Sequence, residues 1–242
     1  SMRGAPMLAP ADLDVERHYG DVFDDDALRA AMVGVDDVFY CVVDTRAWLR
    51  DPAPLFRTNV GGLQHVLDAA VDADLRRFVF TSTIGTIGIP ADDRPATESD
   101  AFNWANRSGS YIQSRVQAEN LALQYATQRG LPVVAMCVSN TYGPGDWAPT
   151  PHGKQIALAA RGKLPFYVDG WDGEVVGVED AANALILAAE KGRNGERYIV
   201  SERVASAREL YEMAAEATGV KPPRFGIPLW AMTLLGGASD AV

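Results

Sequence analysis

A tyrosine and an arginine four positions apart, Tyr111 and Arg115, are the side chains of this sequence best suited to acid–base chemistry. In a helix they share one face, because residues i and i+4 are neighbours on its surface. The cation would stabilise a phenolate and lower the pKa of Tyr111, which makes the phenol a candidate proton-transfer group. The hydroxyl of Thr83, at the end of an apolar run, could hold a substrate oxygen nearby. The same spacing also occurs on ordinary helix surfaces, so the surrounding elements must decide its meaning.

Strand and helix patterns alternate along the segment that carries these residues. Helical spacing, an acidic start or a closing glycine predicts helices at 24–32, 58–73 and 111–129. A continuous apolar run predicts a strand covered on both faces at 38–43. An apolar run that ends in hydroxyls predicts a strand at 77–83, and a further buried strand is predicted at 131–138. Such alternation with short connections is typical of a doubly wound parallel sheet, so we predict an α/β fold.

The carboxyl ends of parallel strands meet at one edge of the sheet, where ligands bind. Four segments of this sequence reach that edge: Asp21–Val22, Val42–Asp44, Thr81–Thr83 and Ser139–Thr141. We therefore expect Thr83 and Tyr111 to approach one cleft from different elements. This combination indicates an active site more specifically than either residue alone.

Beyond Thr141 the pattern loosens into short strands, helices and Gly/Pro turns. We therefore predict a first domain at 1–145 and a small, partly helical C-terminal lobe at 146–242, with 174–192 packing back on the first domain. Trp147 and Trp171, both in loops, are candidates to line a substrate pocket in this lobe.

Composition limits the classes of partner. The formal charge of −10 and the pI near 4.8 argue against nucleic acid or an anionic membrane surface. No apolar run approaches the roughly 20 residues that cross a bilayer. The two cysteines, Cys41 and Cys137, lie in apolar runs, and we expect buried free thiols in the reducing cytoplasm. The three histidines lie far apart without ligand spacing, so no metal site is predicted.

Several short motifs occur together in a characteristic order. They are Gly20-Asp-Val22, Val38–Val43, Asn59-Val60, Arg77–Thr83, Tyr111–Glu119, Tyr142-Gly-Pro144, Val176–Ala182 and Gly195–Ile199. In this order, over about residues 15–230, the chain resembles the extended short-chain dehydrogenase/reductase superfamily. That superfamily comprises NAD(P)-dependent sugar epimerases, dehydratases, dihydroflavonol-type reductases and 3β-hydroxysteroid dehydrogenases. The resemblance implies a Rossmann-like fold, NAD or NADP as cofactor, a small-molecule substrate and a homodimer formed through helices 58–73 and 111–129.

The resemblance also implies a role for each matching position. Thr83 would be the catalytic Ser/Thr, Tyr111 the acid/base tyrosine, and Arg115 would take the place of the family's lysine. Asn59 would brace the central strands. The residues implied in cofactor binding are Asp21 and Val22 at the adenine, Val42 and Val43 along the groove, Val138, Ser139, Asn140 and Thr141 at the nicotinamide, and also Thr81, Tyr111 and Arg115.

Two departures from the family pattern matter. The strand, Gly-x-x-Gly-x-x-Gly turn and helix that hold the cofactor pyrophosphate have no counterpart here, so the sequence is expected to begin after the first βαβ unit. Arg115 replaces a point-charge ammonium with a planar fork, which is not a conservative exchange. The sequence of 80–88, together with Thr45–Leu49, resembles the reductase and hydroxysteroid-dehydrogenase branch more than the sugar epimerases. This resemblance implies hydride transfer between NAD(P)(H) and a secondary alcohol or ketone. The alternatives are a nucleotide-sugar epimerase or dehydratase and a non-catalytic, ligand-binding relative.

Overall fold

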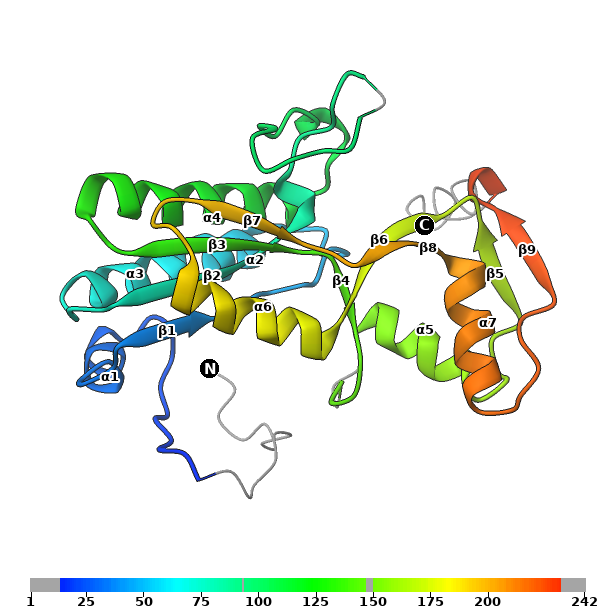
Figure 1. Cartoon of the computed structure of the whole chain (residues 1–242), viewed down its shortest axis with the longest axis horizontal. Helices are drawn as coiled ribbons and strands as arrows, with labels where there is room; N and C mark the ends of the chain where they lie inside the picture. Colours follow the sequence, from blue (N-terminus) through cyan, green and yellow to red (C-terminus); the bar gives the residue numbers. More distant parts are fainter. Residues whose placement is uncertain (1–13, 93, 147–149, 232–242) are drawn as a thin grey trace. The chain divides into compact units, whose positions relative to one another are not determined.

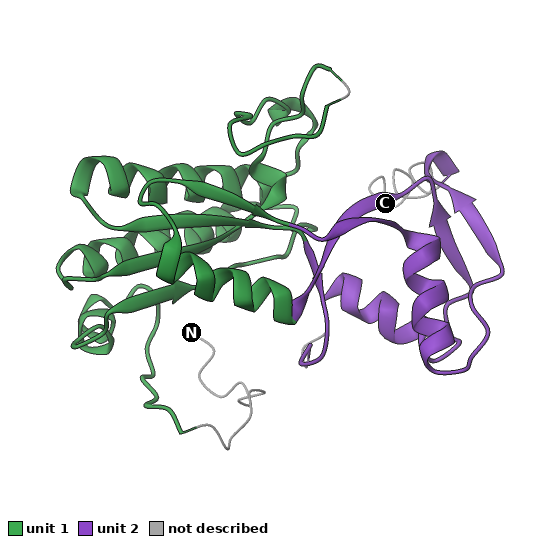
Figure 2. Cartoon of the chain, in the orientation of Figure 1, with its two compact units in different colours: residues 1–6, 10–139, 179–200 green, residues 7–9, 140–178, 201–242 purple. Residues whose placement is uncertain are grey.

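The computed structural model describes residues 14–92, 94–146 and 150–231 (Figure 1). Within this part the chain forms two compact units (Figure 2). The first contains residues up to 139 and 179–200, and the second contains 140–178 and the residues from 201 onward. The division therefore falls after residue 139 instead of 145, and the segment that returns to the first unit is 179–200 instead of 174–192.

A four-stranded parallel sheet forms the centre of the first unit. Its strands, in spatial order, are β1 (Asp37–Tyr40), β2 (Arg77–Thr83), β3 (Val133–Val138) and β7 (Arg197–Val200). The register of β2 and β3 pairs Thr83 with Val138, so these two strands end together. The predicted parallel α/β fold is confirmed, and the predicted strand at 77–83 has the bounds of β2.

The helices of this unit are α1 (Asp25–Ala31), α2 (Ala53–Phe56), α3 (Leu63–Val71), α4 (Ser110–Arg129) and α6 (Val178–Lys191). The expected helix at 58–73 is interrupted, because Arg57–Gly62 form a π-helical turn, η1. A Cβ atom on Gly62 would lie 2.8 Å from Val22 Cγ2, so the glycine permits this turn to approach Val22 closely. π-Helical turns inside helices frequently occur at functional sites.

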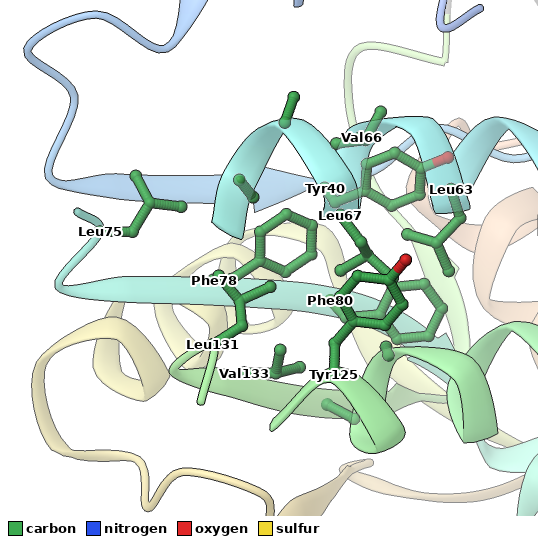
Figure 3. Packing of buried hydrophobic residues seen from close by; sticks show 14 of the residues in the cluster. Tyr40, Leu63, Val66, Leu67, Leu75, Phe78, Phe80, Tyr125, Leu131 and Val133 are labelled. Carbon is green, nitrogen blue, oxygen red and sulfur yellow. The ribbon is translucent and has the colours of Figure 1, made fainter. Parts of the chain in front are cut away.

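The hydrophobic core lies between one face of the sheet and helices α3 and α4 (Figure 3). Phe78 and Phe80 of β2 are fully buried, and the ring of Tyr40 stacks against both, with centroids 6.2 and 6.1 Å away. Leu63 and Leu67 of α3 pack into the same cluster. Burial of these large apolar side chains, each contributing about 1.5–3 kcal/mol, fixes the layers that carry Thr83 and Tyr111.

The predicted strand at 38–43 is confirmed in part, at Asp37–Tyr40, but the prediction that both of its faces are covered was wrong. β1 ends at Tyr40, and the side chains of Phe39, Val42 and Val43 are 43%, 43% and 39% exposed. The physical reason is position, because β1 pairs only with β2 among the described strands and lies at the edge of their sheet. Cys41, in the same segment, is an exposed free thiol, whereas Cys137 of β3 is buried as expected.

In the described part of the chain, the second unit contains two small sheets and the helices α5 and α7. One sheet joins β4 (Asn140–Tyr142), β6 (Asp172–Gly177) and β8 (Arg203–Ser206), and the other joins β5 (Phe166–Asp169) and β9 (Phe225–Pro228). Helices α5 (Pro151–Ala159) and α7 (Ala207–Ala217) pack together, and Tyr211 Oη donates to Gln155 Oε1 at 2.7 Å. Trp171 stacks on His152, with ring centroids 6.4 Å apart, while Trp147 lies outside the described residues. Of the helices that the structure describes, none combines the length and apolarity needed to cross a bilayer.

Candidate active site

Thr83 lies at the carboxyl end of β2 and begins a short 3₁₀ turn, η2 (Ile84–Thr86). Its Oγ1 accepts a hydrogen bond of 3.2 Å from the Gly85 amide. A Cβ atom on Gly85 would lie 2.5 Å from Ile112 Cδ1, so the glycine lets this turn approach the Ile112 side chain of α4 closely. Since Ile112 follows Tyr111, the fold brings the predicted Thr83 and Tyr111 segments together.

Tyr111 occupies the first turn of α4 and is partly buried. Its backbone carbonyl accepts a 2.7 Å hydrogen bond from Ser114 Oγ, which fixes the start of the helix. Burial raises the pKa of Tyr111 above its ordinary value, and the positive charge of Arg115 partly opposes that rise. The phenol is therefore neutral near pH 7 and is suited to donate a proton.

Arg115 is almost completely buried, with 2% of its surface exposed. One guanidinium nitrogen, Nη2, donates to the carbonyl oxygen of Thr81, and the guanidinium carbon lies 5.0 Å from the centre of the Phe80 ring. The second terminal nitrogen, Nη1, is buried and has no hydrogen-bond partner in the described part of the chain. Burial lowers the pKa of Arg115, but a guanidinium still carries its charge at neutral pH.

This arrangement is compatible with the predicted place of Arg115 and Tyr111 at the nicotinamide ribose of NAD(P). A buried donor without a partner is costly and suits a ligand atom that accepts its hydrogen bond. A ribose hydroxyl at Arg115 Nη1 would fill that role beside the phenol of Tyr111. The sequence contains no Gly-x-x-Gly-x-x-Gly motif, so no residues of this chain are assigned to the pyrophosphate.

Asn59 ties the segment after β1 to α4. It is fully buried in η1, and its amide donates to the Asp44 carbonyl and to Ser114 Oγ, both at 3.0 Å. Its Oδ1 accepts from the Asp44 amide at 2.7 Å. Asn59 therefore braces the end of β1 against the helix that carries Tyr111, instead of bracing the central strands with one another.

Four predicted cofactor residues lie around the start of the described chain and the end of β1. Asp21 Oδ1 accepts from the Phe23 amide at 3.2 Å, which lowers the pKa of the Asp21 carboxyl. Val22 lies against Gly62 of η1. Val42 and Val43 follow β1 with exposed side chains. Their contacts with a cofactor stay predictions.

The other predicted cofactor residues follow β2 and β3. Thr81 offers its carbonyl to Arg115, and its Oγ1 lies 3.2 Å from Cys41 Sγ. Val138 ends β3, and Ser139 is buried directly after it. Asn140 and Thr141 belong to the second unit, where the Asn140 amide donates to the Glu174 carbonyl at 2.9 Å. A role for these residues at the nicotinamide also stays a prediction.

Two buried residues beside this site were not singled out from the sequence as candidate functional residues. Burial raises the pKa of Tyr40, and the charge of Arg115 partly opposes that rise. The Tyr40 hydroxyl has no hydrogen-bond partner among the described residues. Glu119 follows Arg115 by one helical turn and is 2% exposed. The i, i+4, i+8 spacing of Tyr111, Arg115 and Glu119 was the available signal for Glu119.

Comparisons with known proteins agree with this fold. Residues 3–201 match the family model described as the NAD dependent epimerase/dehydratase family. The chain is 32% identical over 223 residues to a putative dihydroflavonol 4-reductase of Synechocystis, covering 90% of this chain and 64% of that protein. It is 31% identical over 211 residues to 4-hydroxy-2-methyl-3-oxo-4-farnesyl-3,4-dihydroquinoline-1-oxide ketoreductase of Stigmatella aurantiaca, covering 85% and 61%.

A solved structure gives the same result for the fold. The dTDP-glucose 4,6-dehydratase DesIV of Streptomyces venezuelae, solved with NAD bound, superimposes with a TM-score of 0.74 at 26% identity. The superposition covers 86% of this chain and 66% of that one. The chain therefore spans somewhat less than two thirds of these curated relatives, and it belongs to the NAD dependent epimerase/dehydratase family.

Proposed function

We propose that this chain takes part in hydride transfer between NAD(P)(H) and a secondary alcohol or ketone. The main support for this proposal is the buried side chain of Arg115. Its Nη1 has no hydrogen-bond partner in the described structure, and it lies next to Tyr111. The similarity to proteins named as a dihydroflavonol reductase and a ketoreductase supports reduction of a ketone.

The side chains of this site divide the work between them. NAD(P)H, when bound, supplies the hydride to the carbonyl carbon of the substrate. The Gly85 amide already donates to Thr83 Oγ1, so the hydroxyl proton of Thr83 is free to bond the substrate oxygen. Tyr111 gives its proton to that oxygen, which completes the alcohol, and Arg115 stabilises the phenolate left behind.

The test combines cofactor binding with turnover. NADH and NADPH are titrated by fluorescence and melting temperature, and reduction is followed in wild type and Tyr111→Phe. Tyr111→Phe should retain cofactor binding and lose roughly a hundredfold or more in turnover, the usual contribution of a positioned proton donor. Tyr125→Phe is the matched control, since that phenol also lies on α4 but donates to Asp68 Oδ1 at 2.7 Å. Binding of neither cofactor, or full turnover by Tyr111→Phe, would refute the proposal.

The similarity to a dTDP-glucose 4,6-dehydratase favours a second candidate, epimerisation or dehydration of a nucleotide sugar. Such an enzyme recycles its cofactor and retains it during purification. NAD found in the purified protein, together with stabilisation by uridine or thymidine diphosphate, would select this function over net reduction. Activity that appears only in Arg115→Lys would instead indicate a non-catalytic natural chain.

Three further properties complete the proposal. The second unit supplies the substrate contacts, and two chains associate through the regions of α3 and α4. The protein acts in the cytoplasm, which the two free cysteines Cys41 and Cys137 support. Light scattering of the purified chain tests the dimer, and a monomer at micromolar concentration would exclude it.

A further inference from the structure

A second charged group lies inside the first unit, one turn beyond Arg115. Glu119 is 2% exposed and has donors at both carboxylate oxygens. Oε2 accepts from Ser82 Oγ, from Thr86 Oγ1 at 2.7 Å and from Cys137 Sγ at 3.4 Å. Oε1 accepts from Arg197 Nη1 at 2.8 Å. One carboxylate thus joins α4 to β2, η2, β3 and β7.

Two of these donors flank Thr83. Ser82 precedes it in β2, and Thr86 closes the turn that Thr83 begins. Thr86 Oγ1 also lies 2.8 Å from the carbonyl oxygen of Thr83. Glu119 therefore contacts the chain immediately before and after the predicted catalytic hydroxyl, from the helix that carries Tyr111.

Arg197 extends the network to the connection between Thr83 and α4. Its Nε donates to the Glu98 carbonyl at 2.7 Å, and its Nη2 donates to the Asp100 carbonyl at 2.9 Å. The Asp100 carbonyl also accepts from the Gly88 amide at 2.9 Å, and the Glu98 carboxylate accepts from the Ile199 amide at 2.9 Å. The guanidinium of Arg197 thus fastens the connection, residues 84–107, to β7.

We propose that Glu119 and Arg197 are positioning residues that hold Thr83, α4 and the connection 84–107 in the arrangement used for catalysis. The inference rests on the proposed function. It follows from topology, because residues 84–107 form most of the connection between Thr83 and the start of α4 at Ser110, so movement of this connection displaces both catalytic groups. Neither residue needs to touch substrate, and a displacement of about 1 Å in such a site lowers turnover by roughly a hundredfold.

The variants separate positioning from simple stabilisation. Arg197→Met removes the bonds to Glu98 and Asp100 and leaves the buried Glu119 charge unpaired, which is strongly destabilising. The double variant Glu119→Gln/Arg197→Met no longer has an unpaired buried charge, but it still lacks the hydrogen bonds to the Glu98 and Asp100 carbonyls. Glu119→Gln alone leaves Arg197 on those carbonyls. Arg77→Met is the matched control, since that arginine of β2 donates to the Ala189 carbonyl at 3.3 Å instead.

Hydrogen exchange and melting temperature form the first arm of the test. In Arg197→Met, the Gly88 and Ile199 amides should exchange at least about tenfold faster than in wild type. They should exchange by a local opening of the connection, which needs less free energy than global unfolding. The double variant should recover melting temperature without recovering this protection, and Arg77→Met should retain it. Recovery of both quantities in the double variant would show a role in stability alone and overturn the proposal.

Kinetics form the second arm, with NADH or NADPH as hydride donor and 1-phenyl-1,2-propanedione as probe ketone. Arg197→Met and the double variant should lose roughly tenfold or more in kcat, while KM for the cofactor changes by less than about twofold. If kcat is unchanged although hydrogen exchange shows that the connection 84–107 opens, the positioning role is overturned. If the wild-type chain binds neither cofactor, the proposed function is refuted. The role of Glu119 and Arg197 is judged separately by hydrogen exchange, and normal protection of the Gly88 amide in Arg197→Met would overturn it.

Discussion

Replacing Arg115 by methionine removes a buried cation beside Tyr111 and keeps most of the apolar stem. In the wild-type chain burial raises the pKa of Tyr111, and Arg115 opposes this rise. Methionine leaves only the burial effect, so the pKa of Tyr111 should increase further. A nearby opposite charge favours the charged form of a titratable group, so the loss of Arg115 should raise the pKa of Tyr111 further in the direction that burial already sets.

The stability of the same variant should change little. The bond from Arg115 Nη2 to the Thr81 carbonyl is lost, which costs roughly 1.5–3 kcal/mol for a charged donor. Removal of a desolvated cation whose Nη1 has no partner in the described structure offsets that cost. We therefore expect the free energy of unfolding at pH 7 to stay within about 1 kcal/mol of wild type.

Tyrosine ionisation near 295 nm measures the predicted shift. The chain has eight tyrosines, so the signal of Tyr111 is taken as the difference from a Tyr111→Phe titration, measured both in the wild-type background and in the Arg115→Met background. Arg115→Lys is the control that keeps a positive charge and should largely preserve the pKa of Tyr111. Ketone reduction needs the protonated phenol, so turnover should fall as pH rises through this pKa, and the fall should move to higher pH in Arg115→Met. An identical Tyr111 titration in wild type and Arg115→Met would refute the electrostatic coupling.

Three further outcomes are expected. Burial raises the pKa of Tyr40 to about 12. The free energy of unfolding is therefore unaffected by this group below pH 10 and falls as the pH rises from 10 toward 12, where the unfolded chain loses the phenol proton first. Tyr40→Phe should remove roughly 2–3 kcal/mol of this alkaline destabilisation in urea unfolding. Asn59→Ala leaves the buried partners at Asp44 and Ser114 unbonded and should lower the unfolding free energy by roughly 3 kcal/mol. A Cβ atom on Gly88 would lie 2.1 Å from the Ala101 carbonyl oxygen, so Gly88→Ala should cost about 1–3 kcal/mol and speed hydrogen exchange across 84–107. Unchanged pH dependence, stability or exchange, respectively, would contradict these expectations.

Local sequence signals were sufficient for the centre of the fold. The segment 77–83, an apolar run that ends in hydroxyl side chains, matches β2, since a strand inside a parallel sheet has neighbours on both faces. The helix predicted at 111–129 corresponds to α4, and Gly130 ends it with φ at 71°, a conformation that glycine adopts without strain. These signals are local, so they needed no knowledge of distant contacts.

Other features depended on contacts that no local pattern carries. The run at 38–43 has the composition of a buried strand, yet its exposure depends on which strands pair with it. The π-helical turn at Arg57–Gly62 lies inside a helical pattern and contains two glycines, but its register is fixed by Asn59 bonding to Asp44 and Ser114. The unit boundary after residue 139 follows from packing and not from composition.

The net electrostatic effect of the neighbouring charges on the pKa of Tyr111 is the property hardest to predict from helical spacing. Arg115 and Glu119 are one turn apart, so the carboxylate would neutralise the guanidinium if these were the only charges present. Arg197, 78 positions away in sequence, pairs with Glu119 and leaves the field of Arg115 available to the phenol. Arg197→Met should therefore also raise the pKa of Tyr111, by less than Arg115→Met because Arg197 acts through Glu119. The same 295 nm titration measures both shifts, and a larger shift in Arg197→Met would contradict this order of influence.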